Sequence, residues 1–202
     1  MNRLVDYCVV PQGYEFKFKE NGSLYTYVFG ANGLFVAGKN EIFKAIIPVQ
    51  TIKEEKRFVR GLGVIKPFFF IEERVPNCLL HKMIGTSRWA MPNEVLFYLD
   101  MDFITQSWML TAPQQQCSPT SIRPLENRKY VPLEVHSHNS MPAFFSETDN
   151  RDETGLRLYG VLGRVDQPVV DFRLRVSIYG HYAFLPYQLV FMPHPEVRNV
   201  ND

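Results

Sequence analysis

Two histidines, a serine and an aspartate lie close together in the segment EVHSHNSMPAFFSETDNRD, residues 134–152. On a β-strand, side chains at positions i and i+2 project from the same face, so His136 and His138 can share one metal ion. Zn²⁺ binds imidazole nitrogens at about 2.0–2.1 Å, and Asp149 can supply a third ligand from the start of an expected helix. Three protein ligands leave a fourth position for water, as in catalytic zinc sites. The alternative is a polar turn in which Ser146 and Asp149 only cap a helix.

The interval between these residues is more specific than the histidines alone. The order His136-x-His138, seven residues, then Ser146-x-x-Asp149 matches the HxHx₇SxxD signature of the JAMM (MPN-plus) metallopeptidases at all four positions. The chain therefore resembles that family. The resemblance implies that His136, His138 and Asp149 bind one zinc ion per chain and that Ser146 helps to stabilise the oxyanion. It also implies that an upstream glutamate acts as the general base.

The candidates for that base are Glu72, Glu73, Glu94, Glu126 and Glu134. In the family, the base lies in a P-x-E segment at the start of the strand after the first helix. Pro92-Asn93-Glu94, in MPNEVLFYL, matches that pattern, so we expect Glu94 to be the catalytic base. Glu134 is the second candidate, because alternate residues of a strand project from the same face and Glu134 alternates with the two histidines. We expect it to neighbour the site.

The elements expected around these residues form a mixed α/β (α+β) domain. RVPNCLLHKMIGTSRWA has apolar residues at helical spacing, NEVLFYLD, TQSWMLTAP and VPLEVHSH are expected strands, and SETDNRDET begins a helix. A polar, proline-containing loop covers residues 113–130, and two closing strands follow the second helix. The resemblance implies the JAMM/MPN (cytidine-deaminase-like) fold, a mixed sheet flanked by helices. We expect this metallopeptidase domain to span residues 73–192, with 193–202 as a tail.

Residues 1–72 are expected to form a β-rich N-terminal extension or small subdomain. Polar and apolar residues alternate on both sides of Asn21-Gly22, which predicts a hairpin turn there, and Asn32-Gly33 predicts a second turn. The segment NEIFKAIIPV is compatible with either a strand or a short helix. The family resemblance around the zinc motif does not account for this region.

Composition excludes several classes of partner. The chain has 22 basic and 21 acidic residues, a net charge of +1, so it has no strong field to attract nucleic acid or an anionic membrane. Its three cysteines are widely spaced, which predicts free thiols in a reducing cytoplasm. We find no signal-peptide pattern and no apolar run of membrane-spanning length, so we expect a cytoplasmic protein.

A further resemblance covers nearly the whole chain. HSHNSMPAFFSETDNRDETGLRLYGVLGRV, RVSIYGH, GANGLFVAG and VRGLG resemble the A-protein family of the bacterial PRTRC (ParB-related, ThiF-related cassette) systems. Such cassettes also encode an E1/ThiF-like protein and a ubiquitin-like protein. This implies a zinc isopeptidase that acts at the C-terminus of a ubiquitin-like protein or its conjugates. The alternative is a non-catalytic or latent MPN-type module that binds a ubiquitin-like partner. Asn139, where the JAMM family usually has proline, is a departure that concerns loop shape.

Overall fold

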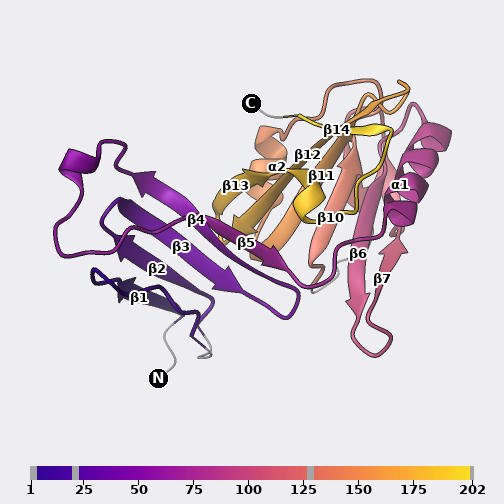
Figure 1. Ribbon diagram of the computed structural model, residues 1–202. Helices are drawn as coiled ribbons and strands as arrows, with labels where there is room; N and C mark the ends of the chain where they lie inside the picture. The colour runs from indigo at the N-terminus through magenta and orange to yellow at the C-terminus, as the bar shows by residue number, and fades with distance from the viewer. Residues whose placement is uncertain (1–3, 20–22, 127–129, 201–202) are drawn as a thin grey trace. The chain divides into compact units, whose positions relative to one another are not determined.

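The computed structural model describes residues 4–19, 23–126 and 130–200, and the chain forms two compact units (Figure 1). Unit 1 comprises Met1–Glu72, Thr154–Leu156 and Ser177–Ala183. Unit 2 comprises Glu73–Glu153, Arg157–Val176 and Phe184–Asp202. Both units are built mainly from strands, so the described part of the chain is a mixed α+β structure with few helices.

Unit 1 contains a five-stranded sheet in sequence order. Its strands are β1 (Val5–Val9), β2 (Tyr25–Gly30), β3 (Gly33–Lys39), β4 (Phe43–Thr51) and β5 (Phe68–Ile71). Strands β2 to β5 are antiparallel neighbours, β1 pairs with β2 in parallel, and a 3₁₀ turn occupies Glu55–Arg57. The segment that fits either a strand or a helix is therefore strand β4. The expected turn at Asn32-Gly33 joins β2 to β3, whereas Asn21-Gly22 lies outside the described residues.

A second sheet of seven strands has the order β13-β12-β11-β10-β6-β7, with β14 paired to β12. The strands are β6 (Leu96–Asp102), β7 (Ser107–Thr111), β10 (Leu133–Ser137), β11 (Leu156–Gly163), β12 (Val170–Ile178), β13 (His181–Leu185) and β14 (Val197–Asn199). β10 is parallel to β11 and antiparallel to β6. Residues 193–202 were expected to be a tail, but β14 within them pairs in parallel with β12, so part of that segment belongs to the sheet.

The two helices cover opposite faces of this sheet. α1 (Asn77–Ala90) buries Leu80, Met83 and Ile84, which recur at helical spacing, and it borders a cavity with Phe97 of β6. Phe97 lies opposite Val135 in the β6–β10 register, so both point to the α1 face. His136 points to the other face, where α2 (Glu147–Asp152) lies. Within the described residues, we find no helix with both the length and the apolar character needed to cross a membrane.

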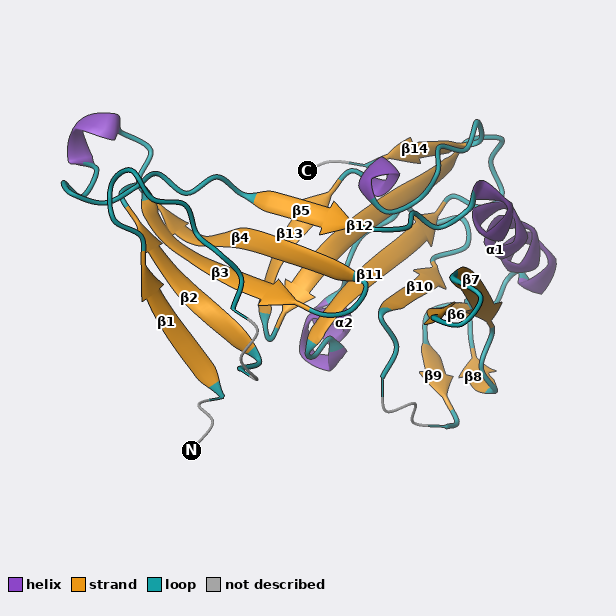
Figure 2. Cartoon of the chain, turned by 60° about the horizontal axis from the view of Figure 1, so that its bottom comes forward, coloured by secondary structure: helices purple, strands orange, loops and turns teal. Residues whose placement is uncertain are grey.

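The expected polar loop at residues 113–130 contains a short hairpin, β8 (Gln115–Cys117) and β9 (Ile122–Pro124), seen beside β6 in Figure 2. Ile122 packs against Leu96 and Tyr98 of β6, on the sheet face that also carries His136. The Gln115 side chain accepts a hydrogen bond from the Leu96 N–H at 2.8 Å and donates to the Leu96 carbonyl at 3.2 Å. These contacts fix the hairpin beside the histidine strand.

Gly163 permits the loop after the histidine strand to lie against the end of β11. A Cβ at this position would collide with the backbone of Pro142 and Ala143 and lie 2.7 Å from the Met141 carbonyl oxygen. That loop is held by backbone hydrogen bonds from the Arg164 N–H to Met141 and from the Val165 N–H to Asn139, both 2.7 Å. Any side chain at Gly163 must therefore displace this loop.

We expect Gly163→Ala to lower the free energy of unfolding by about 1–3 kcal/mol, the usual cost of overpacking. Gly85→Ala is the matched control, because a Cβ there meets no atom within 4 Å and alanine favours the interior of α1. It should stabilise the protein by about 0.5–1 kcal/mol. Urea unfolding followed by tryptophan fluorescence measures both effects, since Trp89 and Trp108 lie in unit 2. A neutral Gly163→Ala would contradict the packing argument.

Candidate metal centre

The two histidines of the HxH motif face each other at the end of β10. His136 is in the strand, and His138 follows its last residue, Ser137. The His138 N–H donates to the Leu162 carbonyl at 2.7 Å, which continues the pairing with β11 beyond the strand. The two Nε2 atoms are 3.1 Å apart, and the ring of Phe144 packs edge-on against His138 with a centroid separation of 4.5 Å. Both imidazoles are therefore presented side by side on one sheet face.

Asp149 joins this pair from the first turn of α2, and its two carboxylate oxygens have different roles. Ser146 is the N-cap, and Asp149 Oδ2 accepts hydrogen bonds from the Ser146 N–H at 2.6 Å and from its hydroxyl at 2.7 Å. In return, the Asp149 N–H donates to Ser146 Oγ at 3.1 Å, which completes a capping box. Asp149 Oδ1 lies 3.8 Å from His136 Nε2. The cap thus fixes one oxygen and leaves the other facing the histidines.

The three side chains fit a single small cation. His136, His138 and Asp149 each offer one ligand atom, and all these atoms lie within 4.8 Å of one another. A tetrahedral zinc site with bonds of about 2.0–2.1 Å separates neighbouring ligand atoms by about 3.3 Å. The observed separations of 3.1 and 3.8 Å bracket that value.

The protonation state of the histidines also suits a metal. Burial lowers the pKa of His136 to about 4, although the Asp149 carboxylate works against this shift. Burial lowers the pKa of His138 as well. Both imidazoles are therefore neutral at neutral pH, which is the form that binds metal.

Glu94 enters this site through the pairing of β6 with β10. The Ser137 N–H donates to the Val95 carbonyl at 3.0 Å, and Ser137 Oγ accepts from the Val95 N–H at 2.9 Å. Leu96 pairs with His136, and Val95 bonds to Ser137, the next residue along. If this antiparallel register continues by one more residue, Glu94 lies opposite His138. Glu94 is only 5% exposed. The expected base is therefore buried next to the expected ligands.

The electrostatic setting of Glu94 is unusual for a carboxyl group. Burial raises its pKa to about 7, and the nearby Asp149 carboxylate adds to the rise. The β8–β9 hairpin contributes to this enclosure, since the Glu94 N–H donates to the Ser118 carbonyl at 3.0 Å. Burial and the Glu94 charge also raise the pKa of the Cys117 thiol in the same hairpin. A carboxyl group with a pKa near 7 can both accept and return a proton at neutral pH.

The other glutamates considered as the base are placed differently. Glu134 shares the His136 face as expected, but it forms a 2.6 Å ion pair with Arg157. Burial raises the pKa of Glu134, and the Arg157 guanidinium opposes that rise. Glu72, Glu73 and Glu126 are exposed. Of the candidates, Glu94 is the one that combines burial with a neighbouring carboxylate, Asp149, among the expected ligands.

Sequence reasoning missed the buried arginine that contacts α2. Arg175 of β12 is 1% exposed, and its guanidinium donates to Asn150 Oδ1 and to Glu153 Oε2, both at 2.7 Å. Burial raises the pKa of Glu153 to about 8, although the Arg175 charge works against this rise. One signal was available, because an arginine inside the strand VVDFRLRVSI requires a buried partner.

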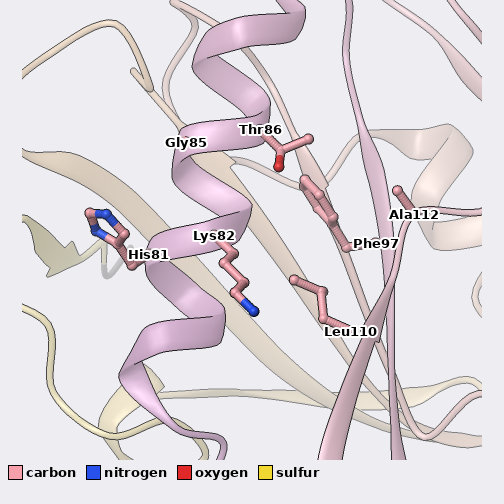
Figure 3. Close-up of a pocket in the computed structure, with 7 residues that line it drawn as sticks. All are labelled: His81, Lys82, Gly85, Thr86, Phe97, Leu110 and Ala112. Carbon is pink, nitrogen blue, oxygen red and sulfur yellow. The ribbon is translucent and has the colours of Figure 1, made fainter.

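A separate cavity of about 480 Å³ lies between α1 and the strands β6 and β7 (Figure 3). Its lining includes His81, Lys82 and Thr86 from α1, with Phe97 and Leu110 opposite. None of the candidate metal or catalytic residues lines it, and it is on the α1 face. The polar cluster around His136 is therefore distinct from this cavity.

Comparisons with known proteins add little to this picture. Neither a family model nor a curated protein matches the chain. Among solved structures, the solution structure of protein DSY2949 from Desulfitobacterium hafniense is similar with a TM-score of 0.36 and 13% identity. The similarity covers 64% of this chain and 93% of that one.

Glu94 should destabilise the metal-free protein at high pH. Its carboxyl keeps its proton up to about pH 7 when folded, against 4.5 in the unfolded reference. The folded state thus binds more protons in that window, so stability falls by up to about 3 kcal/mol as pH rises through it. Glu94→Gln mimics the protonated form, and we expect it to be more stable than the wild type at pH ~8 and to lose this slope.

The measurement is urea unfolding across pH with a chelator present. The exposed Glu126→Gln is the control and should keep the wild-type profile. Identical pH profiles for Glu94→Gln and the wild type would show that the Glu94 carboxyl is not buried as described.

Proposed function

We propose that this chain is a zinc-dependent metallopeptidase or isopeptidase of the JAMM/MPN type. The observation that carries the proposal is the convergence of His136, His138 and Asp149 beside the buried Glu94, whose pKa is raised to about 7. The HxHx₇SxxD interval and the P-x-E segment fit that family at every position. The mixed sheet with helices on opposite faces is compatible with the JAMM/MPN fold.

The residues of the site have separable roles. His136, His138 and one oxygen of Asp149 would hold the zinc ion. Bound zinc would supply Lewis acidity, polarising a carbonyl oxygen and lowering the pKa of water. Glu94 would accept a proton from the water that attacks the scissile carbonyl, and it would give that proton to the leaving amine. Ser146 would donate a hydrogen bond from its hydroxyl to the developing oxyanion. For this, the hydroxyl must first break its hydrogen bond to Asp149 Oδ2.

The substrate class rests on the resemblance to the PRTRC A-protein family. We propose a peptide or isopeptide bond at the C-terminus of a ubiquitin-like protein, with an E1/ThiF-like protein as an operon partner. The proposal sets the reaction in a bacterial cytoplasm. The near-zero net charge is compatible with a protein substrate and gives no support to nucleic acid.

A second candidate is a non-catalytic or latent module that binds a ubiquitin-like partner. The observation in its favour is that the Ser146 hydroxyl donates to Asp149 and is not presented toward an open position. A protein that binds zinc and a ubiquitin-like protein but cleaves no fusion would support this alternative.

Metal content tests the ligand set. We expect the wild type to bind one zinc ion per chain and His138→Ala to bind zinc at least about 10-fold more weakly, because it loses one of three ligands. His81→Ala is the matched control, since His81 is an exposed residue of α1 beside the separate cavity. Elemental analysis after dialysis reports the stoichiometry. A His138→Ala protein that keeps a full zinc ion would refute the proposed site.

Activity tests the base. With a ubiquitin-like fusion as substrate, Glu94→Gln should retain zinc and lose at least about 100-fold in rate, because it cannot accept the proton. A chelator should abolish the wild-type activity. Glu134→Gln decides between the two glutamates, and it should retain much more activity than Glu94→Gln. A large loss in Glu134→Gln with a normal Glu94→Gln would reverse the assignment.

A further inference from the structure

One buried guanidinium contacts α2 on both sides of Asp149. Arg175 donates from Nη1 to Asn150 Oδ1 at 2.7 Å and pairs through Nε and Nη2 with Glu153 Oε2 at 2.7 and 2.6 Å. Its Cζ also lies 3.7 Å from the centroid of the Phe145 ring. Phe145 precedes the N-cap Ser146, and Glu153 is the C-cap. A single side chain from β12 therefore contacts the residue before the N-cap of α2, a residue inside the helix and its C-cap.

α2 has few other means of staying in place. It is only six residues long and contains no buried residue, so apolar burial does not fix it to the sheet. An isolated helix of this length is unstable in water. The capping box orders the first turn internally but does not tie it to another element. The tie to the sheet comes from Arg175, whose strand is paired in the interior of the seven-stranded sheet.

The contact of Arg175 with Phe145 and Asn150 occupies the same positions as a hydrophobic staple, a motif at helix N-termini, but it uses a guanidinium group in place of apolar packing. In a hydrophobic staple, the residue before the N-cap packs on the fourth helical residue and fixes the angle at which the chain enters. Here those two positions are Phe145 and Asn150, and the Arg175 guanidinium contacts both. It stacks on the ring and hydrogen-bonds to the amide. Asp149 is the residue directly before Asn150, so its orientation depends on this contact.

We propose that Arg175 is a positioning residue for the metal site, which holds α2 so that Asp149 Oδ1 faces His136 and His138. This inference rests on the proposed zinc function. Glu153 serves in it by accepting from the Arg175 guanidinium, whose side chain is 2% exposed and whose charge would repel a cation nearby. The role of Arg175 is thus geometric, and its charge alone would act in the opposite direction.

The two possible roles of Arg175, positioning and charge, therefore predict opposite changes in zinc affinity when Arg175 is replaced. If Arg175 acted only as a nearby positive charge, Arg175→Met would tighten zinc binding. Positioning predicts the reverse, a loss of about 10- to 100-fold in zinc affinity, the usual effect of removing a group that orients a metal ligand. Asn150→Ala removes one of the contacts at an exposed position and should weaken zinc binding by about 2- to 10-fold.

The control is Arg88→Met, the same substitution at another anchoring arginine of unit 2. Arg88 donates to the Val165 and Gln167 carbonyls and pairs with Glu196, away from α2. Zinc affinity is measured by competition with a chromophoric chelator. Amide hydrogen exchange across residues 146–153 is measured on the metal-free proteins, and Arg175→Met should accelerate it by about 10-fold or more. Arg88→Met should change neither quantity.

The two measurements separate this inference from the proposed function. Faster exchange in α2 together with weaker zinc binding supports the positioning role. Unchanged exchange in both Arg175→Met and Asn150→Ala overturns it, as does unchanged or tighter zinc binding. If the wild type binds no zinc, the proposed function fails, and the exchange data still decide whether Arg175 holds α2. Should Arg175→Met fail to fold, Asn150→Ala decides by the same two criteria.

Discussion

The alignment of β6 with β10 is the constraint on which the candidate site depends. Ser137 exchanges two hydrogen bonds with Val95, one through its backbone and one through its buried side chain. A slip of one residue would turn His136 to the α1 face and separate it from Asp149. The serine between the histidines therefore has a structural role, because it fixes the strand that carries the ligands against the strand that follows Glu94.

Much of this arrangement was predictable from local sequence, and the remainder depends on non-local pairing. α1 follows from apolar residues at helical spacing after Pro76, and the capping box follows from Ser146-x-x-Asp149. The hairpin β8–β9 and strand β14 were not predictable in the same way. Each of these three strands has only three residues, which is too short to show an alternation of polar and apolar residues. The hairpin is defined by its packing on β6, and β14 by its pairing with β12. The specific fold name remains a prediction from the family motif.

The side chains that contact α2 were likewise not predictable from local sequence. Glu153 has the sequence appearance of an exposed acid near a helix, whereas its side chain is 8% exposed and paired with Arg175. The two residues are separated by an entire strand and a turn, so only the folded sheet brings them together. Burying such a pair yields little net stability, because the desolvation of both charges offsets their attraction. Its value in this protein is better understood as specificity of position for a helix that apolar packing cannot hold.

The charges on this sheet face are incompletely balanced. Glu134 and Glu153 each pair with an arginine, whereas Glu94 and Asp149 have no lysine or arginine partner among the described residues. Their mutual repulsion contributes to the raised pKa of Glu94. The cation that we propose to be held by His136, His138 and Asp149 would offset the charge of both carboxylates. The same imbalance keeps Glu94 ready to exchange a proton near neutral pH, and this ties its burial to the proposed chemistry.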